Sequence, residues 1–102
     1  MSEADVSTWR SRRERLDAVI DSARARVAAA GAELRVQVDP NEEPSPAVTW
    51  NWHITCTAEG IEVDVIASQD LAQFAIEDGS GRFEIETDAA GFPEVLTRRL
   101  LQ

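Results

Sequence analysis

The sequence has 102 residues, of which 43% are hydrophobic and 28% are charged, and its formal net charge is -9. This size and composition are typical of one globular domain that folds without disulfides or metals, and they exclude a disordered tail and a membrane-spanning protein. The strong acidity disfavours binding to nucleic acids or anionic membranes, and it favours a basic protein partner.

The charge is divided unevenly along the chain. All ten basic residues are arginine. Residues 1–38 contain seven arginines and six acidic residues, whereas residues 39–102 contain three arginines and thirteen acidic residues. We therefore expect a nearly neutral N-terminal part and a strongly acidic remainder.

The cysteine content and the first residues favour a cytoplasmic protein. Cys56 is the single cysteine, so it cannot form an internal disulfide. Glu3 and Asp5 stand where a signal peptide would carry basic residues followed by an apolar run.

Residues 8–30 are predicted to form one amphipathic helix, preceded by frayed residues 1–7. Ser7 or Thr8 is the expected N-cap, and Gly31 is the expected stop at the C-terminal end. The predicted buried stripe recurs at helical spacing. It consists of Trp9, Leu16, Ile20, Ala23, Val27 and Ala30.

Four arginines cluster near the start of this helix: Arg10, Arg12, Arg13 and Arg15. Such a cluster can bind phosphate groups, but acidic residues lie among these arginines. We interpret it as a helix surface with ion pairs at i,i+4 spacing, and we expect no nucleic-acid partner. The two expected pairs are Arg10 with Glu14 and Arg13 with Asp17.

Alternation of apolar and polar residues predicts three strands, over residues 33–38, 47–57 and 61–67. Residues 39–46 contain three prolines and three acidic residues, so they are predicted to form a solvated loop. A tight turn at Glu59-Gly60 predicts a register in which apolar residues face apolar residues. Its pairs are Ala58 with Ile61, Cys56 with Val63, Ile54 with Val65, and Trp52 with Ala67.

A second hairpin is predicted from residues 71–77 and 82–87, joined by a turn over Asp78-Gly-Ser-Gly81. The expected inward residues of its first strand are Ala72, Phe74 and Ile76. The expected cross-strand pairs are Phe83 with Ile76, Ile85 with Phe74, and Arg82 with Glu77. The segment from Asp88 to Pro93 is predicted to open a short last helix in which Pro93 suits the first turn, with Val95, Leu96 and Leu100 on one side.

The predicted order is α-β-β-β-β-β-α, in a single α+β domain over residues 1–102. Consecutive strands joined by short turns predict an antiparallel five-stranded meander sheet. We expect the long N-terminal helix to pack on one face of this sheet and the short C-terminal helix to follow it. The other face is then polar and open to water.

The open face and the proline-rich loop provide the predicted partner-binding residues. An acidic surface can bind a basic protein by charge complementarity. The alternative interpretation is that polar residues on a half-exposed sheet serve only solubility. The predicted residues are Asn51, His53, Thr55, Glu62, Asp64, Glu77, Glu84 and Glu86 on the sheet, and Glu42 and Glu43 in the loop.

His53 is the only histidine, and the predicted register places it diagonal to Asp64. An imidazole beside a carboxylate could act as a general base or a metal ligand. No second histidine, cysteine or serine nucleophile accompanies it in the pattern. The sequence therefore predicts no catalytic residue, cofactor or metal, and we interpret Cys56 as a buried core residue.

Together these features favour a non-enzymatic, acidic protein-binding module. The leading hypothesis is an immunity protein or antitoxin-like inhibitor that neutralises a basic bacterial toxin domain. One alternative is an acidic homodimeric secretion chaperone, and a second is a small enzyme that uses His53 with Asp64. The sequence leaves open whether the protein is a monomer or a homodimer.

Overall fold

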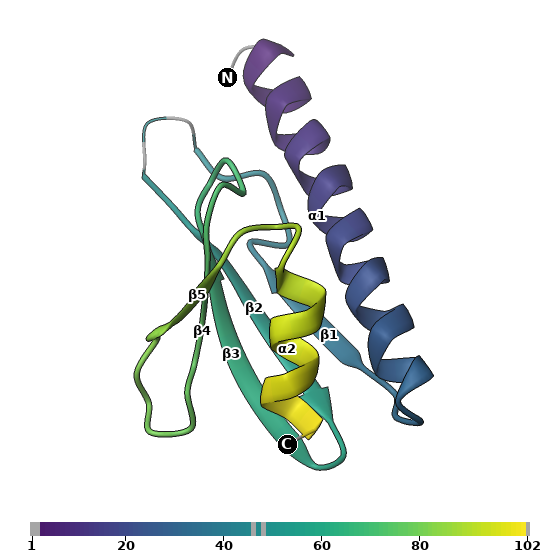
Figure 1. Ribbon diagram of the computed structural model, residues 1–102. Helices are drawn as coiled ribbons and strands as arrows, with labels where there is room; N and C mark the ends of the chain where they lie inside the picture. Colours follow the sequence, from purple (N-terminus) through teal and green to yellow (C-terminus); the bar gives the residue numbers. More distant parts are fainter. Residues whose placement is uncertain (1–2, 46, 48, 102) are drawn as a thin grey trace.

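The structure is a computed structural model that describes residues 3–45, 47 and 49–101. One five-stranded antiparallel sheet has the strand order β1-β2-β3-β4-β5, with a helix at each end of the chain (Figure 1). This arrangement confirms the predicted α+β meander. The elements are α1 (Glu3–Ala29), β1 (Arg35–Asp39), β2 (Trp52–Ala58), β3 (Ile61–Ala67), β4 (Phe74–Ile76), β5 (Ile85–Thr87) and α2 (Phe92–Leu101).

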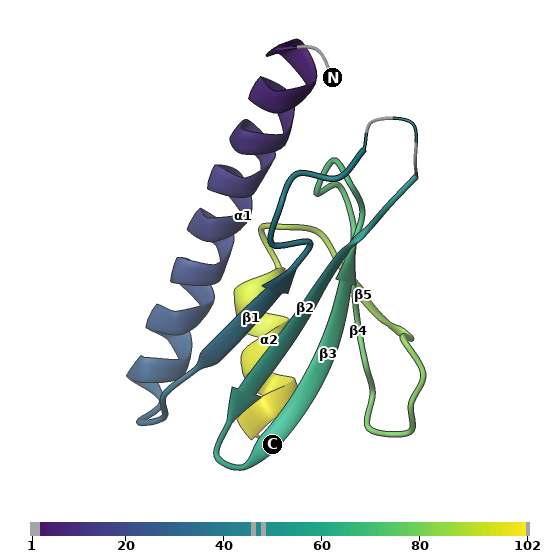
Figure 2. The ribbon, with the colours of Figure 1, turned by 180° about the vertical axis from the view of Figure 1, so that it is seen from behind.

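Both helices lie on the same face of the sheet, as Figures 1 and 2 show from opposite sides. The short helix α2 contacts β2 and β3, at the centre of the sheet, whereas α1 packs mainly against α2. The sequence predicts that α1 covers this face of the sheet, and it does not predict that α2 lies over the central strands. The physical reason is that α2 presents a continuous apolar side, on which Phe92, Leu96 and Leu100 are fully buried.

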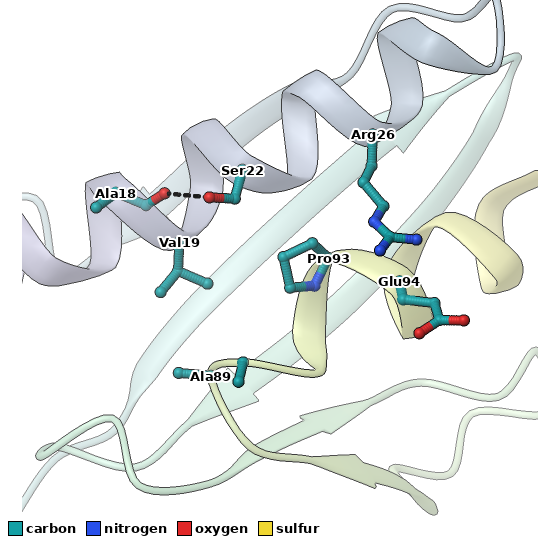
Figure 3. A pocket seen from close by; sticks show the side chains of 8 residues that line it. Ala18, Val19, Ser22, Arg26, Ala89, Pro93 and Glu94 are labelled. Carbon is teal, nitrogen blue, oxygen red and sulfur yellow. Dashed lines mark hydrogen bonds between the residues drawn. The ribbon is translucent and has the colours of Figure 1, made fainter.

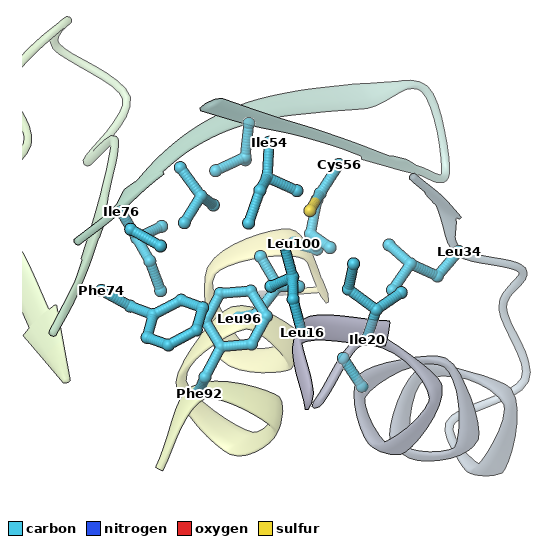
Figure 4. Close-up of a cluster of buried hydrophobic side chains, with 14 of the residues drawn as sticks. Leu16, Ile20, Leu34, Ile54, Cys56, Phe74, Ile76, Phe92, Leu96 and Leu100 are labelled. Atoms are coloured by element: carbon cyan, nitrogen blue, oxygen red, sulfur yellow. The ribbon is translucent and has the colours of Figure 1, made fainter. Parts of the chain in front are cut away.

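The core lies between the sheet and the two helices (Figure 4). The rings of Phe74 and Phe92 join β4 to α2, with centroids 4.7 Å apart. Trp52 is fully buried, and its ring lies 6.1 Å from that of Trp9 and 4.9 Å from that of Trp50. The largest fully buried side chains include Trp52, Phe74, Phe92, Leu16, Ile54, Ile76, Leu96 and Leu100.

The predicted register of β2 and β3 is confirmed. Cys56 lies opposite Val63 and Trp52 lies opposite Ala67, so both strands present their apolar residues to the helices. The connecting turn has positive φ at Glu59 (52°) and Gly60 (77°), which is the geometry that suits a tight hairpin.

The predicted register of β4 and β5 is wrong by two residues. Ile76 lies opposite Ile85, and Phe74 lies opposite Thr87, in place of Phe83 and Ile85. The Asp78 N–H donates to the carbonyl of Arg82, but the strands pair only from Ile76 and Ile85 onward, so the connection between them is a wide loop. A two-residue shift preserves side-chain alternation, so the same residues still face the core.

The ends of α1 also differ from the prediction. The helix begins at Glu3, so Ser7 and Thr8 lie inside it and neither is the N-cap. The backbone of residues 3–7, within the segment predicted to fray, is helical. Gly31 has φ of +88° just after the helix, as its predicted role as a stop requires. Ala30 is exposed and does not extend the buried stripe.

One of the two predicted ion pairs of α1 forms. The Nε of Arg13 lies 3.1 Å from the Oδ1 of Asp17. Among the described residues, Arg10 and Glu14 form no such pair, and both are exposed.

The strand predicted over residues 71–77 is shorter than expected because its first half is a tight turn. The Asp70 carboxylate accepts hydrogen bonds from the Ser68 hydroxyl (2.9 Å) and the Ala72 N–H (3.1 Å). Leu71 adopts a positive φ of 64°. Ala72 is consequently exposed, and the prediction that it faces the core is wrong.

Candidate partner-binding face

The face of the sheet that carries no helix is turned toward the viewer in Figure 2. We call it the open face. Its residues alternate with the residues of each strand that face the helices, and none of them is buried. They are Arg35, Gln37, Asp39, His53, Thr55, Thr57, Glu62, Asp64, Ile66, Ala75 and Glu86.

The register aligns the open-face residues in rows across the strands. The row that crosses all five strands consists of Asp39, His53, Ile66, Ala75 and Glu86. Its two ends are acidic, and its centre is apolar. Two shorter rows lie beside it and end on β3 at Asp64 and Glu62. The open face therefore has a small apolar centre, with carboxylates at both ends of its row and on β3 beside it, which is a more specific pattern than the polar surface that the sequence predicts.

His53, Thr55 and Asp64 lie together on this face, as the sequence predicts for His53 and Asp64. The Nε2 of His53 is 3.6 Å from the Oδ1 of Asp64, and the Thr55 hydroxyl donates to the same oxygen at 3.4 Å. The side chains of His53 and Asp64 are 53% and 45% exposed. Solvent at these exposed side chains weakens any electrostatic coupling between them, so the geometry suits a polar contact surface better than a general base.

Glu77 is not available on the open face, although the sequence predicts it there. Its Oε2 lies 3.3 Å from Nη2 of Arg99 on α2, and both side chains are largely shielded, at 16% and 19% exposed. Its Oε1 accepts the N–H groups of Gly79 (2.6 Å) and Gly81 (2.7 Å). The Gly81 N–H, the Gly79 N–H and Arg99 together lower the pKa of Glu77. Glu77 therefore holds the β4–β5 loop against α2.

Two acidic residues, Glu86 in β5 and Glu84 just before it, extend the open face at its edge. Glu84 and Glu86 are both exposed. The Oε1 of Glu84 lies 3.7 Å from the Nη1 of Arg82. This contact within the loop replaces the predicted Arg82–Glu77 pair. Because both partners are more than 60% exposed, this ion pair neutralises Glu84 only weakly.

The structure separates the loop residues from the sheet residues. Glu42 is exposed in the β1–β2 connection, and Asn51 is exposed just before β2. Glu43 is half-buried and lines a cavity of about 130 Å³ together with Trp9 and Trp50. Since Trp9 belongs to α1, Glu43 lies on the helix side and is not part of the open face.

A groove of about 410 Å³ lies between α1 and the start of α2 (Figure 3). Its lining is Ala18, Val19, Ser22, Arg26, Ala89, Ala90, Pro93 and Glu94. The Ser22 hydroxyl donates to the Ala18 carbonyl at 3.1 Å, so this polar group is satisfied within the helix. The sequence does not predict this groove, because its shape depends on how the two helices are placed.

Neither Cys56 nor any metal-ligand cluster adds chemistry to the described part of the chain. Burial, reinforced by the negative charge of Asp64, raises the pKa of Cys56 to about 12, so the thiol stays protonated at neutral pH. Over residues 3–45, 47 and 49–101, no three His, Cys, Asp or Glu residues are grouped as a metal site. Within the same ranges, no helix is long and apolar enough to cross a membrane.

Comparison with known proteins gives no relative: no protein-family model, no curated protein and no solved structure matches this chain.

Proposed function

We propose that this protein is a non-enzymatic binding module whose open face docks a basic surface of a partner protein. The observation that supports the proposal is a helix-free sheet face on which carboxylates lie at both ends of a row with an apolar centre and beside it on β3. Its acidic residues are Asp39, Glu62, Asp64 and Glu86, and its centre is Ile66 with Ala75.

The charge of this face suits recognition of a cationic protein. Four of the eleven open-face residues are acidic and one, Arg35, is basic. Complementary charge raises the association rate and selects against other acidic proteins, while an apolar centre supplies the desolvated contact area. The residues after position 38 carry a net charge of -10, so the field of the whole domain acts in the same direction.

The function that best fits these properties is that of an immunity protein or antitoxin-like inhibitor of a basic bacterial toxin domain. Such an inhibitor needs a rigid surface and no chemistry of its own. A sheet face supported from behind by two helices supplies that rigidity, since its residues are held in rows by backbone hydrogen bonds.

The alternative of a homodimeric secretion chaperone requires a surface through which two copies associate, and the edge strand β1 offers one. The alternative of a small enzyme is less well supported. His53 and Asp64 are both half-exposed, and the groove between the helices lies on the opposite side of the sheet.

The test measures binding to the basic proteins encoded next to this chain, with charge-neutralised variants. We expect the triple variant Glu62→Gln/Asp64→Asn/Glu86→Gln to associate at least about tenfold more slowly in low salt, because rim charges act mainly on the association rate. The matched control is Glu14→Gln/Asp17→Asn/Asp21→Asn, which removes the same number of exposed acidic residues from α1.

Two results would reject the proposal. One is a neighbouring protein that binds the triple variant as fast as the wild type over the full range of salt concentrations. The other is the absence of any basic or toxic neighbour that binds the wild type.

A further inference from the structure

Strand β1 is an edge of the sheet. It pairs with β2 on one side, and no described strand pairs with its other side. Edge strands expose N–H and C=O groups that can pair with a strand of another chain. Arg35, Gln37 and Asp39 are exposed, while Val36 and Val38 are only half-buried, although they face the helix side.

The sequence of β1 is complementary to itself when two copies run antiparallel. If the twofold axis passes through Gln37, each Arg35 lies opposite the Asp39 of the other copy, and each Val36 lies opposite a Val38. Both ion pairs then fall on the open face, and the four valines fall together on the helix side. We propose that two copies of this chain associate through this β1–β1 pairing.

The other edge of the sheet does not offer the same complementarity. Strand β5 has three residues, Ile85–Thr87. Antiparallel self-pairing centred on Glu86 would place two carboxylates opposite each other, which is destabilising. Within β1, moving the axis to Val36 or Val38 would lose both ion pairs and shorten the paired segment. The complementarity is therefore specific to one edge and one register.

The helix side of β1 is not fully covered. A groove of about 550 Å³ lies between the last turns of α1 and β1, and its lining includes Ala28, Ala32, Leu34 and Val36. A second β1 brings its own valines beside this groove. Burying these half-exposed valines adds apolar stabilisation to the backbone hydrogen bonds.

The pairing would join the two sheets into one continuous sheet with both open faces on the same side. A dimer would present two acidic faces side by side, and it would supply the homodimer that the chaperone alternative requires.

The test is the oligomeric state of the full chain, measured by sedimentation and light scattering over a range of protein concentrations. We expect the wild type to form a dimer and the single variants Arg35→Glu and Asp39→Arg to dissociate at least about tenfold more readily, because each places like charges opposite each other twice. An equimolar mixture of the two variants should dimerise again. In the mixed dimer, the new glutamate at position 35 faces the new arginine at position 39, and native Asp39 faces native Arg35.

A cross-link tests the position of the axis. With Gln37→Cys, the two new thiols lie opposite each other at the twofold axis and should form an intermolecular disulfide under mild oxidation. The matched control, Glu86→Cys, lies on the other edge and should remain uncrosslinked, and the buried Cys56 should not react.

A wild type that stays monomeric at every concentration would overturn the inference. So would a dimer that withstands both charge reversals, or one that cross-links through position 86 and not through position 37. Circular dichroism of each variant confirms that the exposed substitutions leave the fold intact.

Discussion

Shortening one core side chain of α2 tests whether this helix covers the centre of the sheet. Leu96 is completely buried, with 0% accessible surface. It belongs to the helix that contacts β2 and β3. Leu96→Ala removes three carbon atoms, a transfer loss of roughly 2.4 kcal/mol at about 0.8 kcal/mol for each carbon. The cavity left behind raises the expected loss to about 3–4 kcal/mol.

This loss is large compared with the stability expected for a domain of this size, about 5–15 kcal/mol. With a urea m-value of about 1–3 kcal/mol/M, the unfolding midpoint should fall by at least about 1 M. The assay is urea unfolding followed by tryptophan fluorescence, because Trp52 is buried in the same core, and by far-UV circular dichroism.

The matched control is Val95→Ala, one residue earlier in α2. Val95 is only partly buried, so its truncation should cost less than about 1.5 kcal/mol. If Leu96→Ala destabilises the protein no more than Val95→Ala does, α2 does not cover the sheet as described.

Two further predictions concern titratable groups. Cys56 should not react with a thiol reagent in the native protein at neutral pH and should react once urea unfolds it, because burial raises its pKa to about 12; rapid labelling without denaturant would contradict this. In the folded protein the pKa of Glu77 lies below its usual value of 4.5, so on acidification the carboxylate is protonated in the unfolded state before it is protonated in the folded state. The stability that this group contributes is therefore present above the unfolded pKa and is lost as the pH falls from there through the folded pKa. Glu77→Gln should therefore lower the urea midpoint at neutral pH and flatten its fall in acid, whereas an unchanged pH profile would show that the carboxylate does not hold the loop.

The candidate site is only partly predictable from the sequence. Alternation correctly places His53, Thr55, Glu62 and Asp64 together, because the side-chain period of a strand is two and the Glu59-Gly60 turn fixes the register of β2 and β3. The same rule does not place Glu77. Its carboxylate turns toward the loop and Arg99, where backbone N–H groups and a guanidinium offer stronger partners than water does.

The sequence by itself determines the two helices, the order of the strands, the inward residues of β2 and β3 and the excess of negative charge after position 38. These features depend on local periodicity and on short connections, both of which can be recognised within short stretches of the sequence. The tertiary structure alone decides that α2 lies over the centre of the sheet, that β4 and β5 pair two residues further along, and that Ile66 and Ala75 lie at the middle of an acidic face. Each of these depends on which distant segments pack best against one another, and a two-residue shift leaves the hydrophobic pattern of a strand unchanged.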